Sequence, residues 1–289
     1  MPRIAIISKP QKSGLAVILT ELLQWLCSHS FDCILDPQTA EYLGDAALEH
    51  EVIDRTYLAE AAPDLAVSLG GDGTLLSAAR AFSRTATPIV AVNLGSLGFL
   101  TETTVAEMYP TIQAWLDGTA FHDERPLMRC ELLREGSLFR TWNALNDVVA
   151  AKGAIARMAI FAIELDGQFA ARFRADGVIV STPTGSTAYT LAANGPILLP
   201  TLDAMVITAI CPHLLTIRPI VVSGGSEVTL RVEGVPQETY LTVDGQEAVE
   251  LLLGDRILCR RSEHRVHLVR LKPDGLFNVL RAKLSWGEQ

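Results

Sequence analysis

An apolar run that ends abruptly in glycines constrains the fold of this chain more than any other feature. The run covers residues 65–69, the next four residues read Gly-Gly-Asp-Gly, and a helical pattern starts at Thr74. This order is typical of a buried parallel strand that turns tightly into a helix. Glycines permit positive φ angles and let backbone N–H groups approach a ligand closely. We therefore expect the turn to bind an anion beside the N-terminus of the helix.

Asp72 is the unexpected residue in that turn. A carboxylate repels a phosphate bound beside it, so it is unfavourable there unless it holds a metal or removes a proton. One hypothesis is a phosphoryl-transfer site with its own base, and the alternative is a tight turn in which Asp72 caps the next helix. The turn matches neither the G-x-G-x-x-G fingerprint nor the P-loop, and no P-loop occurs in the chain. A Walker-type NTPase is therefore disfavoured.

Composition and charge narrow the class of protein. A chain of 289 residues with 49% hydrophobic and 20% charged residues is long and apolar enough for one large or two modest folded domains. The net charge of −9 argues against a nucleic-acid partner. No apolar stretch reaches the roughly 18 residues that span a bilayer, so we expect no membrane association.

Cysteine usage indicates the cellular compartment. The five cysteines are an odd number and include no C-x-x-C pair. This pattern favours reduced thiols in a cytoplasmic protein over disulfides or a zinc site. The histidines show no metal-ligand spacing either, so we predict no protein-built metal site.

Strand-like and helix-like segments alternate over the first 120 residues. This alternation predicts an α/β domain with a Rossmann-like parallel sheet wrapped by helices. In such sheets ligands lie beyond the carboxyl ends of the strands, where the glycine turn and the segment Asn93 to Gly98 both fall. We expect this domain to cover residues 1–120, with strands at 4–8, 65–69 and 88–94 and helices at 14–30, 74–82 and 105–117.

Short alternating runs punctuated by Asp-Gly and Gly-Gly turns replace this pattern from about residue 125. They predict an all-β sandwich over residues 121–275, with one helix that starts at Ser186 or Thr187 and runs through Ala192. We expect residues 276–289 to pack back on the first domain. The expected strands lie at 127–133, 138–150, 157–165, 168–173, 177–181, 217–222, 226–233, 239–243 and 256–260.

A second candidate site lies at residues 176–189, where a strand runs into a loop rich in serine, threonine and glycine. Its hydroxyls can bond phosphate or ribose oxygens, and Tyr189 offers a flat face to a heterocycle. The alternative is an ordinary turn in which Ser186 or Thr187 caps the next helix. The presence of the glycine turn in the same chain favours a nucleotide site.

These motifs together resemble those of bacterial NAD kinases. Their order and spacing match from residue 1 almost to the end of the chain. The Gly-Gly-Asp-Gly loop alone is shared with diacylglycerol kinases, sphingosine kinases and phosphofructokinases. The segments that carry the resemblance are Gly70-Gly71-Asp72-Gly73-Thr74, Asn93-x-Gly95-x-x-Gly98-Phe99-Leu100-Thr101, Asn146-Asp147, Asp176-Gly177, Thr182 to Tyr189, Pro212-His213, Arg218-Pro219 and Asp244-Gly245-Gln246.

The resemblance implies a phosphotransferase that moves the γ-phosphate of ATP to the adenosine-ribose 2′-hydroxyl of NAD, which yields NADP. Asp72 would be the catalytic base, and Gly71, Gly73 and Thr74 would face phosphates. Magnesium would arrive with ATP and take few ligands from the protein. The family also implies a homodimer or homotetramer.

The resemblance further implies a dinucleotide pocket. Asn146 and Asp147 would hold the adenosine part of NAD, although the family commonly has Asn-Glu here, and the shorter Asp147 makes a looser or water-bridged ribose contact. Arg174 matches an arginine of enzymes restricted to NAD over NADH, with a surface arginine as the alternative. The remaining predicted nucleotide-binding residues are Asn93, Phe99, Arg157, Asp176, Thr184, Thr187, Ala188, Tyr189, Thr190, Ala192 and Gln246.

Two other functions stay open at this point. A lipid kinase would share the Gly-Gly-Asp-Gly loop but should show a hydrophobic cleft or a membrane-surface helix, and neither is evident in the sequence. A non-catalytic dinucleotide sensor would bind NAD without forming NADP, and the intact Asp72 counts against it.

Overall fold

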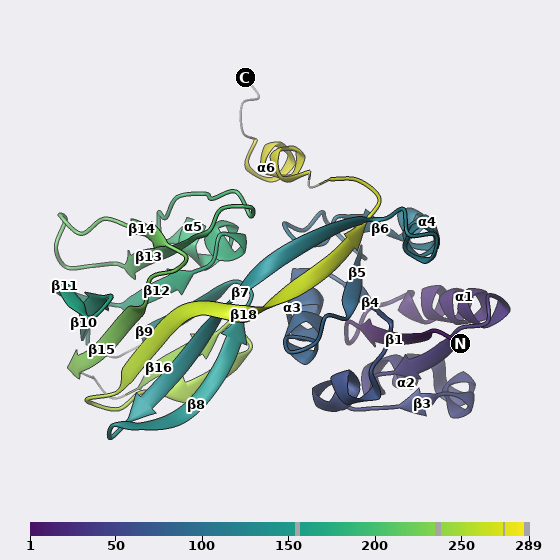
Figure 1. Cartoon of the computed structure of the whole chain (residues 1–289), viewed down its shortest axis with the longest axis horizontal. Helices are drawn as coiled ribbons and strands as arrows, with labels where there is room; N and C mark the ends of the chain where they lie inside the picture. Colours follow the sequence, from purple (N-terminus) through teal and green to yellow (C-terminus); the bar gives the residue numbers. More distant parts are fainter. Residues whose placement is uncertain (154–156, 235–237, 274, 286–289) are drawn as a thin grey trace. The chain divides into compact units, whose positions relative to one another are not determined.

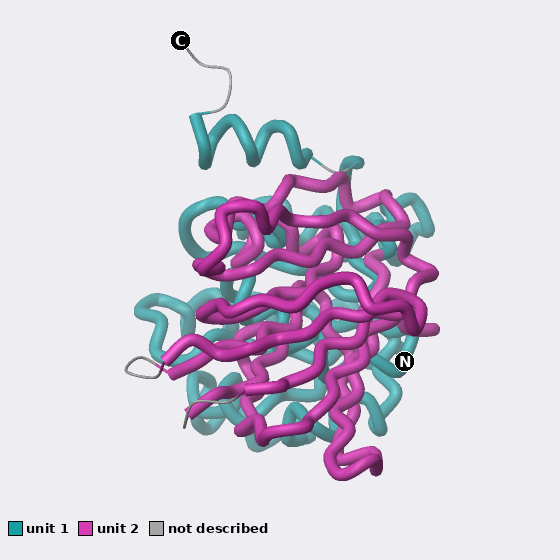
Figure 2. Tube along the Cα trace, turned by 90° about the vertical axis from the view of Figure 1, so that its left-hand side faces the viewer, with its two compact units in different colours: residues 1–124, 265–289 teal, residues 125–264 magenta. Residues whose placement is uncertain are grey.

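The computed structural model describes residues 1–153, 157–234, 238–273 and 275–285. The chain divides into two compact units, residues 1–124 with 265–289 and residues 125–264, which Figure 2 shows in teal and magenta. The boundaries fall inside strands β7 (Phe121–Arg134) and β18 (Arg256–Arg270). Each unit has its own hydrophobic core.

The first unit is an α/β structure (Figure 1). Its strands pair in parallel in the order β18-β5-β4-β1-β2-β3, with β6 beside β5. Its elements are β1 (Arg3–Ser8), α1 (Leu15–Ser28), β2 (Asp32–Leu35), α2 (Pro37–Leu43), the 3₁₀ helix η1 (Gly44–Glu49), β3 (Glu51–Val52), the 3₁₀ helix η2 (Arg55–Ala61), β4 (Leu65–Gly70), α3 (Asp72–Ala81), β5 (Pro88–Asn93), β6 (Thr103–Thr104), α4 (Val105–Leu116) and α6 (Leu276–Leu284).

Helices cover the parallel sheet because its central strands are apolar and buried along nearly their whole length, as in β1 and β4. Ile4 and Ile6 of β1 and Val67 of β4 share one buried cluster with Leu19 of α1 and Met108 of α4. Helix α3 packs on β1, β4 and β5. Burying such strands between helices is the expected stabilisation of a parallel sheet.

The second unit is built from antiparallel strands. One sheet has the order β14-β13-β12-β9-β16-β17, and in the other β11, β10, β15 and β18 pair in sequence while β7 pairs with β8 and β18. Its elements are β7 (Phe121–Arg134), β8 (Ser137–Ala144), β9 (Asp147–Lys152), β10 (Ala159–Leu165), β11 (Gln168–Ala175), β12 (Gly177–Ser181), the 3₁₀ helix η3 (Thr184–Thr187), α5 (Tyr189–Ala192), β13 (Ala204–Ile210), β14 (Ile220–Ser223), β15 (Val228–Gly234), β16 (Thr239–Val243), β17 (Glu247–Glu250) and β18 (Arg256–Arg270).

The structure confirms the predicted fold class, an α/β unit with a parallel sheet and an all-β sandwich. Some details of the prediction are wrong. The run 138–150 is two strands, β8 and β9, and the expected helix through Ala192 is a 3₁₀ turn followed by the four-residue α5. Neither Ser186 nor Thr187 caps α5, because its N-cap is Ala188 and no side chain bonds there.

The C-terminal segment from residue 265 belongs to the first unit. The backbone N–H of Gly275 donates to Glu102 Oε2 over 3.3 Å, just before α6. Residues 286–289 of the predicted tail lie outside the described residues. No helix in the described part of the chain is both long and apolar enough to cross a membrane.

Candidate functional site

The glycine turn joins β4 to α3, as the sequence predicts, but it is built differently. Gly70, Gly71 and Gly73 all keep φ outside the left-handed region, so the expected positive φ angles are wrong. Gly71 is extended, with φ −134° and ψ −165°, and serves as the N-cap of α3. Glycine is needed at position 70 because a Cβ there would lie 2.1 Å from Thr74 Oγ1. Close approach of strand and helix therefore determines this glycine.

Asp72 is the first residue of α3, and its side chain does not cap the helix. Its carboxylate instead accepts four hydrogen bonds from the loop after β5. Oδ2 accepts from Phe99 N (2.9 Å), and Oδ1 accepts from Leu100 N (3.1 Å), Thr101 N (3.1 Å) and Thr101 Oγ1 (3.0 Å). The capping alternative is thus wrong, and Asp72 is a fixed, half-buried carboxylate.

The second glycine-containing loop meets the first at the carboxyl edge of the sheet. Gly70 and Asn93 are register partners, and Leu94 N donates to Gly70 O over 2.8 Å. The Asn93 amide shapes its own loop, since its Oδ1 accepts from Gly95 N (2.8 Å) and its Nδ2 donates to Ser96 O (2.8 Å) and Thr101 O (3.2 Å). The first unit therefore brings both predicted motifs together.

The other predicted residues of the first unit lie around Asp72. Gly71 is half-buried, Gly73 is exposed in the first turn of α3, and Thr74 is buried. The ring of Phe99 is half-buried, and Lys283 Nζ of α6 lies 4.7 Å from its centroid. A cation over an aromatic face is a favourable contact, so α6 contributes positive charge beside the Asp72 loop.

Asn146 and Asp147 lie where β8 passes into β9, and a distant carboxylate organises them. Asp244 accepts hydrogen bonds from three consecutive backbone N–H groups, those of Leu145 (2.9 Å), Asn146 (2.7 Å) and Asp147 (3.1 Å). This arrangement satisfies the N–H groups that leave the sheet ladder between the two strands. The Asn-Asp pair is therefore fixed from the turn between β16 and β17.

The side chain of Asp147 is only 5% exposed and lies near the negative charge of Asp244. Burial, and then the proximity of Asp244, raise the pKa of Asp147 from 3.8 to about 7, against a lowering contribution from the backbone N–H of Tyr189. The carboxyl group therefore changes its charge near neutral pH.

The hydroxyl-rich loop packs on the same two residues. Thr182 Oγ1 donates to Leu145 O over 2.5 Å, and Thr182 N donates to Asn146 O over 2.9 Å. A Cβ on Gly185 would lie 2.1 Å from Asn146 O, so only glycine permits this approach. Ser186 Oγ accepts from Leu198 N over 2.9 Å and so ties the loop to the chain that follows α5. The second motif and the Asn-Asp pair thus form one assembly.

Several buried polar atoms of this assembly have no hydrogen-bond partner within the described part of the chain. They are Asn146 Oδ1, Thr184 Oγ1 and Thr190 Oγ1. Because a buried polar atom without a partner is unfavourable, such a group in a native site is commonly completed by a ligand or water. These atoms are the acceptor and the hydroxyls that a polar ligand would use.

The remaining predicted residues of this unit are more exposed. Thr187 and Ala188 are half-buried, and Tyr189 is 46% exposed. Asp176 pairs with Lys152 over 3.6 Å. Arg174 on β11 and Arg157 are exposed and form no ion pair within the described residues. Ala192 and Gln246 are also exposed.

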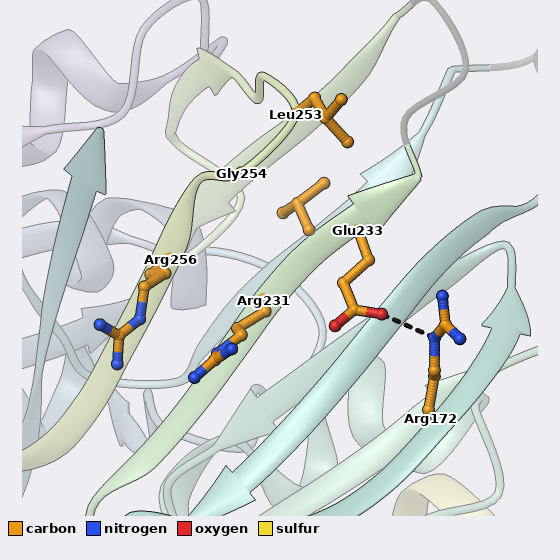
Figure 3. Close-up of a pocket in the computed structure, with 7 residues that line it drawn as sticks. Arg172, Arg231, Glu233, Leu253, Gly254 and Arg256 are labelled. Atoms are coloured by element: carbon orange, nitrogen blue, oxygen red, sulfur yellow. Dashed lines mark ion pairs between the residues drawn. The ribbon is translucent and has the colours of Figure 1, made fainter. Parts of the chain in front are cut away.

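A separate cavity of about 600 Å³ on the β-sandwich is lined by arginines (Figure 3). Arg172 Nε pairs with Glu233 over 2.6 Å, and Arg231 pairs with Glu164 over 2.5 Å. Arg256 lies 3.9 Å from the same Glu164. Each guanidinium in this cavity thus faces a carboxylate, and such exposed pairs contribute little energy. The cavity shares no residue with either motif.

Three residues that the motifs did not single out as functional take part in the two assemblies. They are Thr101, which bonds Asp72, Asp244, which holds residues 145–147, and Lys152, which pairs with Asp176. Thr101 is the last residue of the Asn93 motif and Asp244 begins the Asp244-Gly245-Gln246 segment, but neither motif assigned a role to these two side chains. The described residues contain no group of three or more histidines, cysteines or acids placed to hold a metal.

Family models match both units. Residues 4–120 match the ATP-NAD kinase N-terminal domain, and residues 145–271 match the ATP-NAD kinase C-terminal domain. A protein from Acidobacterium capsulatum named NAD kinase is 54% identical over 289 residues, which is 100% of both chains. A second NAD kinase, from Koribacter versatilis, is 45% identical over the full length of both chains.

Solved structures show the same fold. Yeast NADH kinase complexed with NADH superposes with a TM-score of 0.90 at 26% identity, over 100% of this chain and 89% of the yeast chain. An NAD kinase from Archaeoglobus fulgidus in complex with ATP gives a TM-score of 0.75 at 24% identity, over 98% of each chain. The likeness therefore extends along the whole chain.

Proposed function

Since the chain belongs to the ATP-NAD kinase family and so phosphorylates NAD to NADP, we propose which of its residues carry out that transfer. Asp72 is the catalytic base. The observation that supports this role is the four-donor cradle, which fixes the carboxylate and leaves Oδ2 with one hydrogen bond. An ionised carboxylate oxygen has two acceptor positions, so Oδ2 keeps one for a substrate hydroxyl.

The reaction follows from this assignment. The 2′-oxygen of the adenosine ribose attacks the γ-phosphorus of ATP, and the bond from that phosphorus to the bridging oxygen breaks to release ADP. The hydroxyl proton passes to Asp72 Oδ2. Because phosphoryl transfer has a loose transition state, a carboxylate suffices as the base when proton loss comes late.

Magnesium enters as part of the substrate, the MgATP complex. In this proposal ATP oxygens and water hold most of the coordination positions of the ion, because Mg²⁺ in such sites usually keeps several waters and phosphate ligands. The bound ion neutralises developing charge on the phosphates. Gly71, Gly73 and Thr74, at the N-terminus of the ten-residue α3, bind phosphate oxygens in this proposal.

NAD binds through the second assembly. Asn146 Oδ1, which has no partner within the described residues, accepts a hydrogen bond from the exocyclic amine of adenine. The carboxylate of Asp147 accepts hydrogen bonds from ribose hydroxyls. The hydroxyl groups of Thr184 and Thr190 form hydrogen bonds with the bound NAD. Further contacts with NAD come, in this proposal, from Asn93, Phe99, Arg157, Asp176, Thr187, Ala188, Tyr189, Ala192 and Gln246.

Arg174 selects between oxidised and reduced dinucleotide. It is exposed and forms no ion pair within the described residues, so its guanidinium is available to a ligand. The yeast neighbour is an NADH kinase, so both specificities occur on this fold.

Homo-oligomerisation and a cytoplasmic location complete the proposal. Apolar side chains on and before strand β14 are exposed, among them Leu215 (87%), Ile220 (45%) and Val221 (49%), and a second copy of the chain would cover them. The five cysteines are all free thiols, which agrees with a reducing compartment.

The direct test is product analysis with MgATP and three acceptors, namely NAD, NADH and diacylglycerol. We expect NADP from NAD, with a much lower rate on NADH and no lipid phosphate. Equal rates on NAD and NADH would contradict the role of Arg174. Lipid phosphorylation without NADP would contradict the pocket assignment, and NAD binding without turnover would indicate a sensor.

A further inference from the structure

We propose that Thr101 is a positioning residue for Asp72: its hydroxyl fixes the rotation of the carboxylate so that Oδ2 is the oxygen that accepts the substrate proton. The inference rests on the proposed role of Asp72 as the base. Thr101 itself touches no reacting atom in this account and acts only through Asp72.

The hydrogen-bond donors are distributed unequally over the two carboxylate oxygens of Asp72. Oδ1 receives three donors, from Leu100 N, Thr101 N and Thr101 Oγ1, at 3.0 to 3.1 Å. Oδ2 receives only Phe99 N, at 2.9 Å. Since each carboxylate oxygen has about two acceptor positions, Oδ1 is fully occupied and Oδ2 retains one. The cradle therefore distinguishes two oxygens that are chemically equivalent in free aspartate.

Thr101 supplies the donor to Asp72 that depends on the identity of a side chain. Phe99, Leu100 and Thr101 each donate a backbone N–H, which any non-proline residue supplies. The fourth donor, Thr101 Oγ1, is a side-chain hydroxyl. Thr101 is 1% exposed, and its carbonyl accepts from Asn93 Nδ2 over 3.2 Å, so its backbone is held as well. Burial excludes competing water from the hydroxyl bond.

Gly98 leaves room for this pair of side chains. A Cβ at position 98 would lie 2.1 Å from Asp72 Oδ1 and 2.3 Å from Thr101 Oγ1. The φ angle of Gly98 is not positive, so glycine is needed here for the space that a side chain would fill and not for its backbone conformation. The segment Gly98 to Thr101 thus acts on Asp72, in addition to any contact of Phe99 with the nucleotide.

The test removes the hydroxyl while it keeps the side-chain shape. Thr101→Val should lower kcat about 10- to 100-fold, the effect expected for losing one hydrogen bond to a charged group. The KM for NAD and for ATP should change less than about threefold, because Thr101 does not contact either substrate in this proposal and substrate binding in the ground state is unchanged. Thr101→Ser should restore most of kcat, because the serine hydroxyl can reach the same oxygen.

Thr111→Val is the matched control. Thr111 is fully buried in the same unit, and its hydroxyl donates to Glu107 O over 2.7 Å within α4. This variant removes a buried hydroxyl that does not bond Asp72, so it should keep the wild-type kcat. If valine is not tolerated at position 101, as a lowered Tm would show, Thr101→Ala and Thr101→Ser make the same comparison with smaller side chains.

A double-mutant cycle with Asp72→Asn separates this inference from the proposed function. If Thr101 acts through Asp72, Thr101→Val lowers kcat in the wild-type background and leaves the residual rate of Asp72→Asn unchanged. An equal loss in both backgrounds, or unchanged kcat in Thr101→Val beside an inactive Asp72→Asn, overturns the role of Thr101 alone. Full turnover by Asp72→Asn overturns the base assignment itself.

Discussion

Two aspartates of this protein occupy opposite environments. Asp72 accepts four hydrogen bonds, from backbone N–H groups and one hydroxyl. Asp147 accepts from the N–H of Tyr189 while it lies buried beside Asp244, and its pKa is raised to about 7. Hydrogen-bond donors thus hold the carboxylate of Asp72 in place, whereas burial and the nearby Asp244 disfavour the charged form of Asp147. Neither environment is visible in a motif, because both depend on residues distant in the sequence.

The raised pKa of Asp147 predicts how stability changes with pH. A folded-state pKa of about 7 against an ordinary value of 3.8 means that the folded chain binds this proton more tightly than the unfolded chain. The stabilisation is complete below about pH 4 and is lost as the pH rises towards 7. Asp147→Asn removes the titrating charge, so it should raise Tm at pH 8 by several degrees more than at pH 5.

Thermal unfolding of both proteins at the two pH values checks this prediction. Asp45→Asn, on the exposed 3₁₀ helix η1, is the control and should give the same Tm difference at both. An Asp147→Asn difference that is identical at pH 5 and pH 8 would show that Asp147 does not titrate in this range.

Among the helices and strands, hydrophobic periodicity predicts those whose conformation depends on their own residues. The strand β4 and the helices α1 and α4 follow from periodicity, within one or two residues at each end. The break between β8 and β9 was missed because the Asp244 side chain, nearly a hundred residues away, bonds the N–H groups there. Strands β13 and β17 were missed as well, and β13 is mostly buried, so its apolar run lacks the alternation that signals a strand.

The candidate site was predictable to a similar extent. The Gly-Gly-Asp-Gly and Asn93 motifs were expected at one sheet edge, and the parallel register of β4 and β5 places them there. The contact of Asp72 with residues 99–101 could not be predicted, because it depends on how a loop folds over the edge. For the same reason the helix-cap alternative for Asp72 could be decided only by the structure.

The junction of β4 and α3 gives a test at this scale. Gly70→Ala would place a Cβ 2.1 Å from Thr74 Oγ1 and 2.6 Å from Thr74 Cβ, and a β-branched side chain on a helix cannot easily move away. We expect a loss of about 1–3 kcal/mol in the free energy of unfolding. Gly71→Ala is the matched comparison, since no atom lies within 4 Å of its Cβ and its φ is ordinary.

Urea denaturation of the two variants measures the difference. Equal unfolding free energies for Gly70→Ala and Gly71→Ala would mean that close packing does not determine the first glycine of the turn.

At the scale of the whole molecule, each unit carries one half of the proposed chemistry. The α/β unit holds the fixed carboxylate and the turn that we propose to bind phosphates, and the β-sandwich unit holds the proposed NAD-binding residues Asn146, Thr184 and Thr190 with their unsatisfied polar atoms. The net charge of −9 provides no long-range attraction for two anionic substrates. Local amides, a few basic side chains and the divalent cation that phosphoryl transfer from ATP requires must therefore supply the affinity.

The proposed removal of the ribose proton by Asp72 can be tested by NADP formation with Asp72→Asn beside the wild-type chain. The asparagine keeps the size of the side chain and cannot accept the proton as a base. With MgATP and NAD, we expect a kcat at least about 100-fold below wild type and an NAD affinity, measured by calorimetry, within about threefold of wild type. Wild-type turnover by Asp72→Asn, at unchanged NAD affinity, would show that Asp72 is not the base.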